Sequence, residues 1–135
     1  MRKIEQTMLN AITSARTWSQ DNTRLEVELL PSRSTLVTVI LYRSEIARLE
    51  LSDNGIINCK FTLAEYPTRT TISRINAILS HYSMQSVIMG IGIRKGEPEF
   101  RTRLSPNHSM QCVPILSDKW YSVADTGLIQ LLADR

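Results

Sequence analysis

The stretch YPTRTTISRINAILSHY, residues 66–82, decides the fold that this sequence predicts. After Pro67 and a cluster of threonines, apolar residues recur at intervals of three and four, which places them on one face of a helix. The members of this face are Ile72, Ile75, Ile78, Leu79 and Tyr82. The same period turns Arg74, Ser80 and His81 away from that face. We therefore predict a helix over residues 70–82 with one buried side.

The threonines ahead of this helix predict its N-terminal cap. A threonine hydroxyl can accept a hydrogen bond from the backbone amides that the first helical turn leaves without partners. A second amphipathic stretch lies at the start of the chain, over residues 3–18, and the turn-forming residues 19–23 follow it. We expect these two helices to cover one small sheet.

Between the two helices the apolar period changes from helical to alternating, which predicts four strands. The turn Ser52-Asp53-Asn54-Gly55 is a hairpin signal, because Asn-Gly readily adopts positive φ. Adjacent strands joined by such short turns form an antiparallel meander. The four expected strands are residues 24–30, 35–42, 46–51 and 56–61.

The second part of the chain predicts further strands. Residues 86–104 alternate around a Lys-Gly-Glu-Pro turn and predict a hairpin, and two more short strands are expected at 110–116 and 119–124. Asp125 or Thr126 is placed to cap a last helix that runs through Leu128, Leu131 and Leu132. The fold class is therefore α+β, an antiparallel β-meander with two covering helices plus a β-rich C-terminal extension. We expect a single domain over 1–135, which can be subdivided into a core, 1–83, and an extension, 84–135.

Composition limits the classes of protein that the chain can belong to. Its 135 residues suit one compact domain, and 42% hydrophobic with 21% charged residues is typical of a folded protein. A formal charge of +3 permits an anionic partner without requiring one. No apolar run approaches the roughly 20 residues of a membrane span, and the charged start of the chain is unlike a secretory signal. Cys59 and Cys112 are expected to be reduced thiols, as in a cytoplasmic protein.

Four blocks of the chain carry a resemblance to a known family. They are the opening MRKIEQTMLNAI, the segment NTRLEV at 22–27, the pair IA at 46–47 and TRTTISRINAIL at 68–79. In their order and spacing, residues 1 to about 82 resemble a family of small uncharacterised tailed-bacteriophage proteins. That family often has a His-Gly turn after its second strand, where this chain has Tyr42-Arg43. The resemblance implies a phage or prophage origin and supports the expected order of elements, and it carries no activity or catalytic residue.

The sequence does not contain the motifs by which enzymes are commonly recognised. Gly90-Ile91-Gly92 lacks the third glycine and the following helix of a dinucleotide site, so a smooth strip on a strand, open to close packing, is the favoured interpretation. A zinc site is disfavoured, because compact ligand spacing is missing; the residues considered for it are His81, His108, Cys59 and Cys112. We expect no catalytic residue, no metal and no cofactor.

Two basic features are candidates for binding a partner. The first is the start of the 70–82 helix, where amides, hydroxyls and guanidinium groups would suit a phosphate or carboxylate. It comprises Arg69, Thr70, Thr71 and Arg74. The alternative is an ordinary helix cap with solvated arginines, which is the favoured interpretation because such caps are common.

The second basic feature is the hairpin over residues 94–103. Its members are Arg94, Lys95, Arg101 and Arg103. Arg101 and Arg103 lie two residues apart on a strand, so their side chains share one face and could follow a phosphate backbone. The alternative is that these arginines form the polar side of an edge strand and protect it from aggregation.

Three classes of function are compatible with these features. The favoured one is a non-enzymatic phage accessory protein that binds a host or phage protein, as an inhibitor or adaptor, in the cytoplasm of the infected host. A nucleic-acid-binding protein is the alternative, which the modest net charge and the lack of interleaved aromatic and basic residues weaken. A small enzyme is third. A homo-oligomer is compatible with the sequence, and a membrane partner is not expected.

Overall fold

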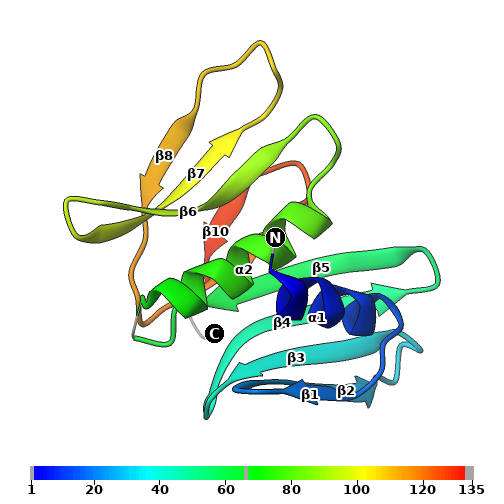
Figure 1. Cartoon of the computed structure of the whole chain (residues 1–135). Helices are drawn as coiled ribbons and strands as arrows, with labels where there is room; N and C mark the ends of the chain where they lie inside the picture. The colour runs from blue at the N-terminus through cyan, green and yellow to red at the C-terminus, as the bar shows by residue number, and fades with distance from the viewer. Residues whose placement is uncertain (1, 66, 133–135) are drawn as a thin grey trace.

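The computed structural model describes residues 2–65 and 67–132, which form two helices and ten strands (Figure 1). The helices are α1, Lys3–Thr13, and α2, Arg69–Tyr82. Seven strands form one antiparallel sheet in the order β1-β2-β3-β4-β5-β9-β10, and three form a second in the order β6-β7-β8. The fold is therefore α+β with a β-rich body, as the sequence predicts. No helix in the described ranges is long and apolar enough to cross a membrane.

The middle of the large sheet is the expected meander. Its strands are β2, Thr23–Leu29; β3, Thr35–Leu41; β4, Ser44–Ser52; and β5, Gly55–Thr62. The β4–β5 turn places Gly55 at φ +106°, a conformation that glycine adopts without a steric cost. One row of cross-strand partners lies under the helices and is buried: Leu25, Val39, Ala47, Phe61 and Tyr121.

Three further strands extend the large sheet at its two edges. Strand β1, Trp18–Gln20, pairs with β2, and β9, Trp120–Val123, pairs with β5. The last strand, β10, Ile129–Leu131, pairs with β9. The prediction of a C-terminal helix is therefore wrong. A turn with Gly127 at φ +96° reverses the chain after Ala124, and the Ala124 amide donates to the carbonyl of Leu128 to close a hairpin.

Helix α1 ends at Thr13, five residues before the expected end. Its C-terminus is a Schellman arrangement, in which the Arg16 amide donates to the carbonyl of Ala11 and the Ala15 amide donates to that of Ile12. Ala15 has φ 51°, a left-handed conformation in which glycine is the usual residue. Because alanine stands at this position, the sequence did not reveal the stop, and Trp18 begins β1 instead of ending the helix.

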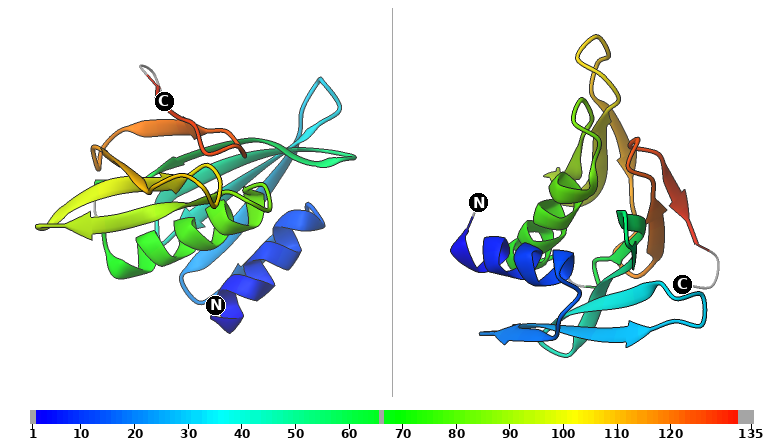
Figure 2. Two further views of the ribbon diagram at one scale, coloured as in Figure 1. Left: turned by 90° about the horizontal axis from the view of Figure 1, so that it is seen from above. Right: turned by 90° about the vertical axis from the view of Figure 1, so that its right-hand side faces the viewer.

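The small sheet contains the expected hairpin. Its strands are β6, Ile88–Arg94; β7, Glu97–Arg103; and β8, Gln111–Pro114. Figures 1 and 2 show this sheet beside α2, with α1 on the other side of that helix. The buried Phe100 of β7 lies 6.5 Å from Phe61 of β5 between ring centroids, and Phe61 lies 5.7 Å from Tyr121. Residues from both parts of the chain therefore share one hydrophobic core.

Candidate functional site

The guanidinium of Arg74 lies inside the protein, where it joins three elements. Its Nη1 lies 2.8 Å from Oε2 of Glu5 on α1, and its Nε donates to the hydroxyl of Thr23 on β2 at 3.1 Å. Ser73 also donates a hydrogen bond to the Glu5 carboxylate. Arg74 and Glu5 are 4% and 3% exposed. The expectation that Arg74 points away from the buried face is therefore wrong, because a partner carboxylate on α1 compensates its charge in the core.

The other predicted residues at the start of α2 divide into capping and exposed groups. The Thr71 amide donates to the Thr68 hydroxyl at 3.1 Å, and the two hydroxyls lie 2.9 Å apart, which is the predicted cap. Thr71 is buried and Thr70 is half-buried. Arg69 is exposed, and it forms no ion pair with any residue that the structure describes. Arg69 is thus the member of this feature whose charge is open to a partner.

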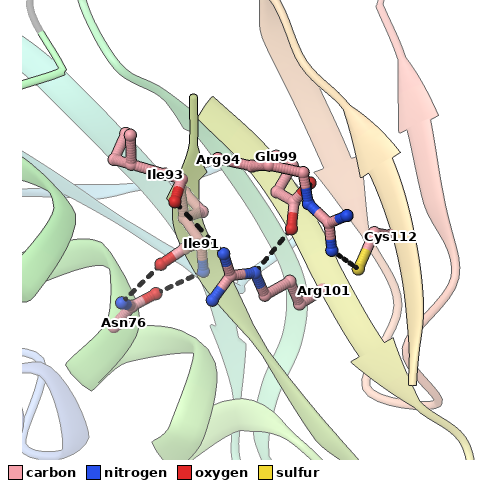
Figure 3. A network of polar contacts seen from close by, with 7 residues as sticks. All are labelled: Asn76, Ile91, Ile93, Arg94, Glu99, Arg101 and Cys112. Carbon is pink, nitrogen blue, oxygen red and sulfur yellow. Dashed lines mark hydrogen bonds and ion pairs between the residues drawn. The ribbon is translucent and has the colours of Figure 1, made fainter. Parts of the chain in front are cut away.

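Glu99 of β7 forms ion pairs with two of the hairpin arginines, Arg94 and Arg101 (Figure 3). One carboxylate oxygen lies 2.6 Å from Nε of Arg101, and the other lies 3.2 Å from Nε of Arg94. The hydrogen bond from Arg101, with smaller contributions from Cys112 and Arg94, lowers the pKa of Glu99 from its ordinary value although burial acts in the opposite direction. The positive charges of this hairpin are therefore weaker attractants for phosphate than their number suggests.

The remaining two basic residues of the hairpin have different surroundings. Lys95 is exposed in the β6–β7 turn, with φ 52°. Arg103 is half-buried, and within the described part of the chain its Nε has no hydrogen-bond partner.

The two glycines of β6 accommodate side chains from neighbouring elements, as the smooth strip predicts. A Cβ at Gly90 would lie 3.0 Å from Oδ1 of Asn76, and a Cβ at Gly92 would lie 2.2 Å from Cζ of Arg101. The Asn76 amide pairs with the edge of β6 as a further strand would: it donates to the carbonyl of Ile91 at 3.0 Å and accepts from the Ile91 amide at 2.6 Å (Figure 3). Strand β6 is thereby fixed against α2.

We expect Asn76→Ala to lower the free energy of unfolding by about 1–3 kcal/mol, because it leaves a donor and an acceptor of Ile91 without partners. Urea unfolding followed by circular dichroism measures the change. Asn10→Ala on the exposed side of α1 is the matched control, since it makes the same helical substitution without this loss. Equal midpoints for the two variants would contradict the role given to Asn76.

A groove between α2 and β6 contains Arg69 of the first basic feature and ends beside the second. Its volume is about 570 Å³, and the start of α1 forms one end of it. Its lining includes the polar residues Glu5, Ser73, Asn76 and Ser80. Arg2 and Arg69 stand at the groove, Ile72 and Ala77 of α2 supply the apolar surface that we call its floor, and the strand wall is Gly92 and Ile93. We call these six residues the α2–β6 groove. The sequence predicted Arg69 but not Arg2 or the apolar floor, because nothing local shows that residues 2, 72 and 93 converge.

Arg94 and Arg101 border the strand wall of the groove from outside it. Arg101 Nη2 donates to the carbonyl of Ile93 at 3.3 Å, and Arg94 follows Ile93 in the chain. Like Arg69, Arg2 is exposed and forms no ion pair within residues 2–65 and 67–132. The groove therefore combines an apolar floor with two uncompensated guanidinium groups.

A second surface feature is the two-residue turn between β3 and β4, Tyr42 and Arg43, which we call the Tyr42 turn. Tyr42 is 65% exposed and has φ 58°, an uncommon conformation for a bulky residue. Arg43 contributes to three adjoining hollows of about 410, 310 and 380 Å³. The turn thus projects between concave surfaces at one end of the large sheet.

Most of the chain matches the model of a known protein family. The model of the Kyanoviridae Gp96 protein family matches residues 1–121. The chain belongs to this family. Kyanoviridae are tailed phages, so the family agrees with the resemblance and extends it from residue 82 through the small sheet into β9. No curated protein and no solved structure matches the chain.

The blocks that resemble the family account for most of the buried polar contacts around α2. The opening block contains Glu5, the block at 22–27 contains Thr23, and the block at 68–79 contains Ser73, Arg74 and Asn76. These side chains bind one another or β6, and they hold α1, α2 and both sheets together. The same blocks also contain four residues of the α2–β6 groove, Arg2, Arg69, Ile72 and Ala77, whereas Gly92 and Ile93 of its strand wall lie outside them.

The residues considered for zinc are spread over different elements. His81 lies on α2 with Nε2 3.2 Å from the Thr13 hydroxyl, and His108 lies beside Ser105 in the β7–β8 loop. Cys59 is enclosed in β5, where burial raises the pKa of its thiol to about 12, and Cys112 is exposed on β8. Among the described residues, no three His, Cys, Asp or Glu side chains gather as a metal site requires.

Proposed function

We propose that this phage protein acts by binding a host or phage protein, as an inhibitor or adaptor in the cytoplasm of the infected host, and not by catalysis. The observation that carries the proposal is the α2–β6 groove, whose apolar floor lies beside the uncompensated Arg2 and Arg69. An apolar centre with a polar rim is the usual anatomy of a protein interface, and arginine is enriched among residues that contribute most to binding.

Contacts within the chain order the walls of the groove without a partner. Glu5 and Arg74 tie α1 to α2 beneath it, and Asn76 fixes β6 to α2 along it. A site that is already ordered loses less conformational entropy on binding, so more of the contact energy contributes to affinity. This supports a binding function for the groove.

The charge of the groove indicates the chemistry of the partner. Among the described residues that line it, Glu5 is the one with an acidic side chain, and the Arg74 guanidinium compensates that carboxylate. The open charges are therefore those of Arg2 and Arg69. We expect a partner segment with an apolar side chain for the floor and acidic residues for the rim, and complementary charge should raise its association rate.

Affinity capture from lysate of infected host cells tests the proposal. The chain and its variant Arg69→Glu are immobilised, the lysate is treated with nuclease, and the retained proteins are quantified by mass spectrometry. We expect a set of proteins that the wild-type chain retains and Arg69→Glu loses by about tenfold or more. Arg33→Glu is the matched control, because it reverses an exposed arginine in the β2–β3 turn, outside the groove. Identical retention by wild type and Arg69→Glu would contradict the proposal.

Nucleic-acid binding is the second candidate, supported by Arg69 lying in the same groove as the strand that leads into Arg94 and Lys95. Burial of Arg74 and the contacts of Arg94 and Arg101 with Glu99 weaken it. Titration of labelled DNA and RNA at about 50 and 200 mM salt separates the two functions, since phosphate contacts lose affinity steeply over this range. Protein binding predicts no association at the lower salt, whereas salt-sensitive binding that Arg101→Glu with Arg103→Glu abolishes would favour nucleic acid.

A further inference from the structure

The side chain of Arg101 crosses strand β6 because residue 92 is glycine. A Cβ at position 92 would lie 2.2 Å from Cζ and 2.4 Å from Nη1 of Arg101, which is closer than such atoms approach. Figure 3 shows the guanidinium over β6, on the side of that strand where Asn76 of α2 lies. An arginine of β7, the middle strand of the small sheet, thereby reaches the strand wall of the α2–β6 groove.

Two of the three guanidinium nitrogens of Arg101 are held by the protein. Nε donates to the carboxylate of Glu99 at 2.6 Å, and Nη2 donates to the carbonyl of Ile93 at 3.3 Å. Nη1 has no hydrogen-bond partner among the described residues, and in Figure 3 it points toward α2. The side chain is 41% exposed. A guanidinium fixed at two nitrogens and open at the third is preorganised to bind an acceptor from one direction.

The charges that remain open at the groove are positive. Arg2 and Arg69 form no ion pair with any residue that the structure describes. The two nearby carboxylates are occupied, Glu5 by one arginine and Glu99 by two, so the strand wall keeps a positive charge. In the β6–β7 turn beyond this wall, one lysine and one glutamate have opposite charges. A ligand that is complementary to this groove therefore carries negative charge.

We propose that the α2–β6 groove binds an acidic segment of a protein, with a carboxylate on Nη1 of Arg101 and an apolar side chain on the floor. The inference rests on the proposed function, and it adds the chemical group that is recognised and a specificity residue that lies outside the groove lining. Guanidinium groups donate strong hydrogen bonds to carboxylates. A protein segment fits better than a nucleic acid, because bases stack on aromatic rings and none of the described lining residues is aromatic.

The variant Gly92→Ala tests the position of Arg101 without changing any charge. Gly92 is not at positive φ, so the backbone accepts alanine, while the new Cβ displaces the guanidinium. We expect Gly92→Ala and Arg101→Gln each to weaken binding of an acidic peptide by about fivefold or more. Because both act on one side chain, the double variant should bind no more weakly than Arg101→Gln alone. Arg103→Gln is the matched control, since it makes the same charge change two residues along β7.

Titration of the isotopically labelled chain, followed by NMR, measures the binding. The probes are a blocked peptide of alternating leucine and glutamate and the same peptide with glutamine in place of glutamate. We expect the glutamate peptide to shift the amide signals of Arg69, Gly92 and Ile93, and added salt to weaken its binding. The glutamine peptide should bind about fivefold more weakly or worse. Equal affinity for the two peptides, or unchanged affinity in Arg101→Gln and Gly92→Ala, would overturn the inference.

The remaining outcomes separate this inference from the proposed function. If neither peptide binds but Arg69→Glu still loses captured proteins, the groove binds protein and the acidic ligand falls. If Arg69→Glu also captures like wild type, both fall. A single-stranded oligonucleotide that shifts the same signals at lower concentration than the glutamate peptide would identify phosphate as the ligand and overturn the inference. If Gly92→Ala lowers the melting temperature, the comparison of Arg101→Gln with Arg103→Gln decides alone.

Discussion

Replacing Arg74 with methionine is expected to lower the free energy of unfolding by about 3–5 kcal/mol. The substitution would leave the carboxylate of Glu5, which is 3% exposed, in the core without its cation. It would also remove the hydrogen bond from Arg74 to Thr23 of β2. A buried charge without compensation is one of the costliest single changes in a folded protein. Chemical denaturation monitored by circular dichroism measures the loss.

Two controls separate the buried pair from ordinary surface charge. Arg24→Met removes an exposed pair with Glu26, 3.6 Å apart, and should cost at most about 1 kcal/mol. The double variant Glu5→Leu with Arg74→Met removes both charges, so it should recover a large part of the stability that the single variant loses. A single Arg74→Met variant no less stable than Arg24→Met would contradict the buried network.

Truncating the core-facing isoleucines of the two helices should be nearly as costly. Ile75 of α2 is 1% exposed and Ile12 of α1 is 0% exposed. We expect Ile75→Ala and Ile12→Ala each to lower the free energy of unfolding by about 2–4 kcal/mol, because each leaves a cavity between helix and sheet. Urea midpoints measure the effect. Ile57→Ala, at a residue that is 52% exposed on β5, should cost less than about 1 kcal/mol, and equal shifts for all three would contradict the assigned core.

Elements with a strong local signal could be predicted from the sequence. Helix α2 shows an uninterrupted apolar period with a capping threonine, and it was predicted to within one residue at its start. The meander was predicted because alternation and the Asn54-Gly55 turn point to the same structure. Where the usual residue was missing, the prediction failed: Ala15 occupies the left-handed position that ends α1, and no glycine marks it.

Contacts between segments that are distant in the chain could not be predicted from the sequence. The helical period places Arg74 off the apolar stripe, and only the approach of Glu5, 69 residues away, explains its burial. The C-terminal helix failed for a related reason, since pairing of β10 with β9 decides the state of that segment and local spacing does not. For the site, composition could identify exposed cations such as Arg69. Their grouping with Arg2, Ile72 and Ile93 depends on the packing of α1 and β6 against α2.

Site-specific photo-crosslinking in infected cells tests most directly whether the α2–β6 groove binds protein. A photoreactive amino acid replaces Ile93 in the strand wall of the groove, and in a control chain it replaces Leu29, which is 74% exposed outside the groove. We predict a crosslinked protein product from position 93 that position 29 does not give, and its mass and peptides distinguish a second copy from another protein. Crosslinking of position 93 to nucleic acid alone, or the same products from both positions, would contradict the assignment of the groove as a protein-binding site.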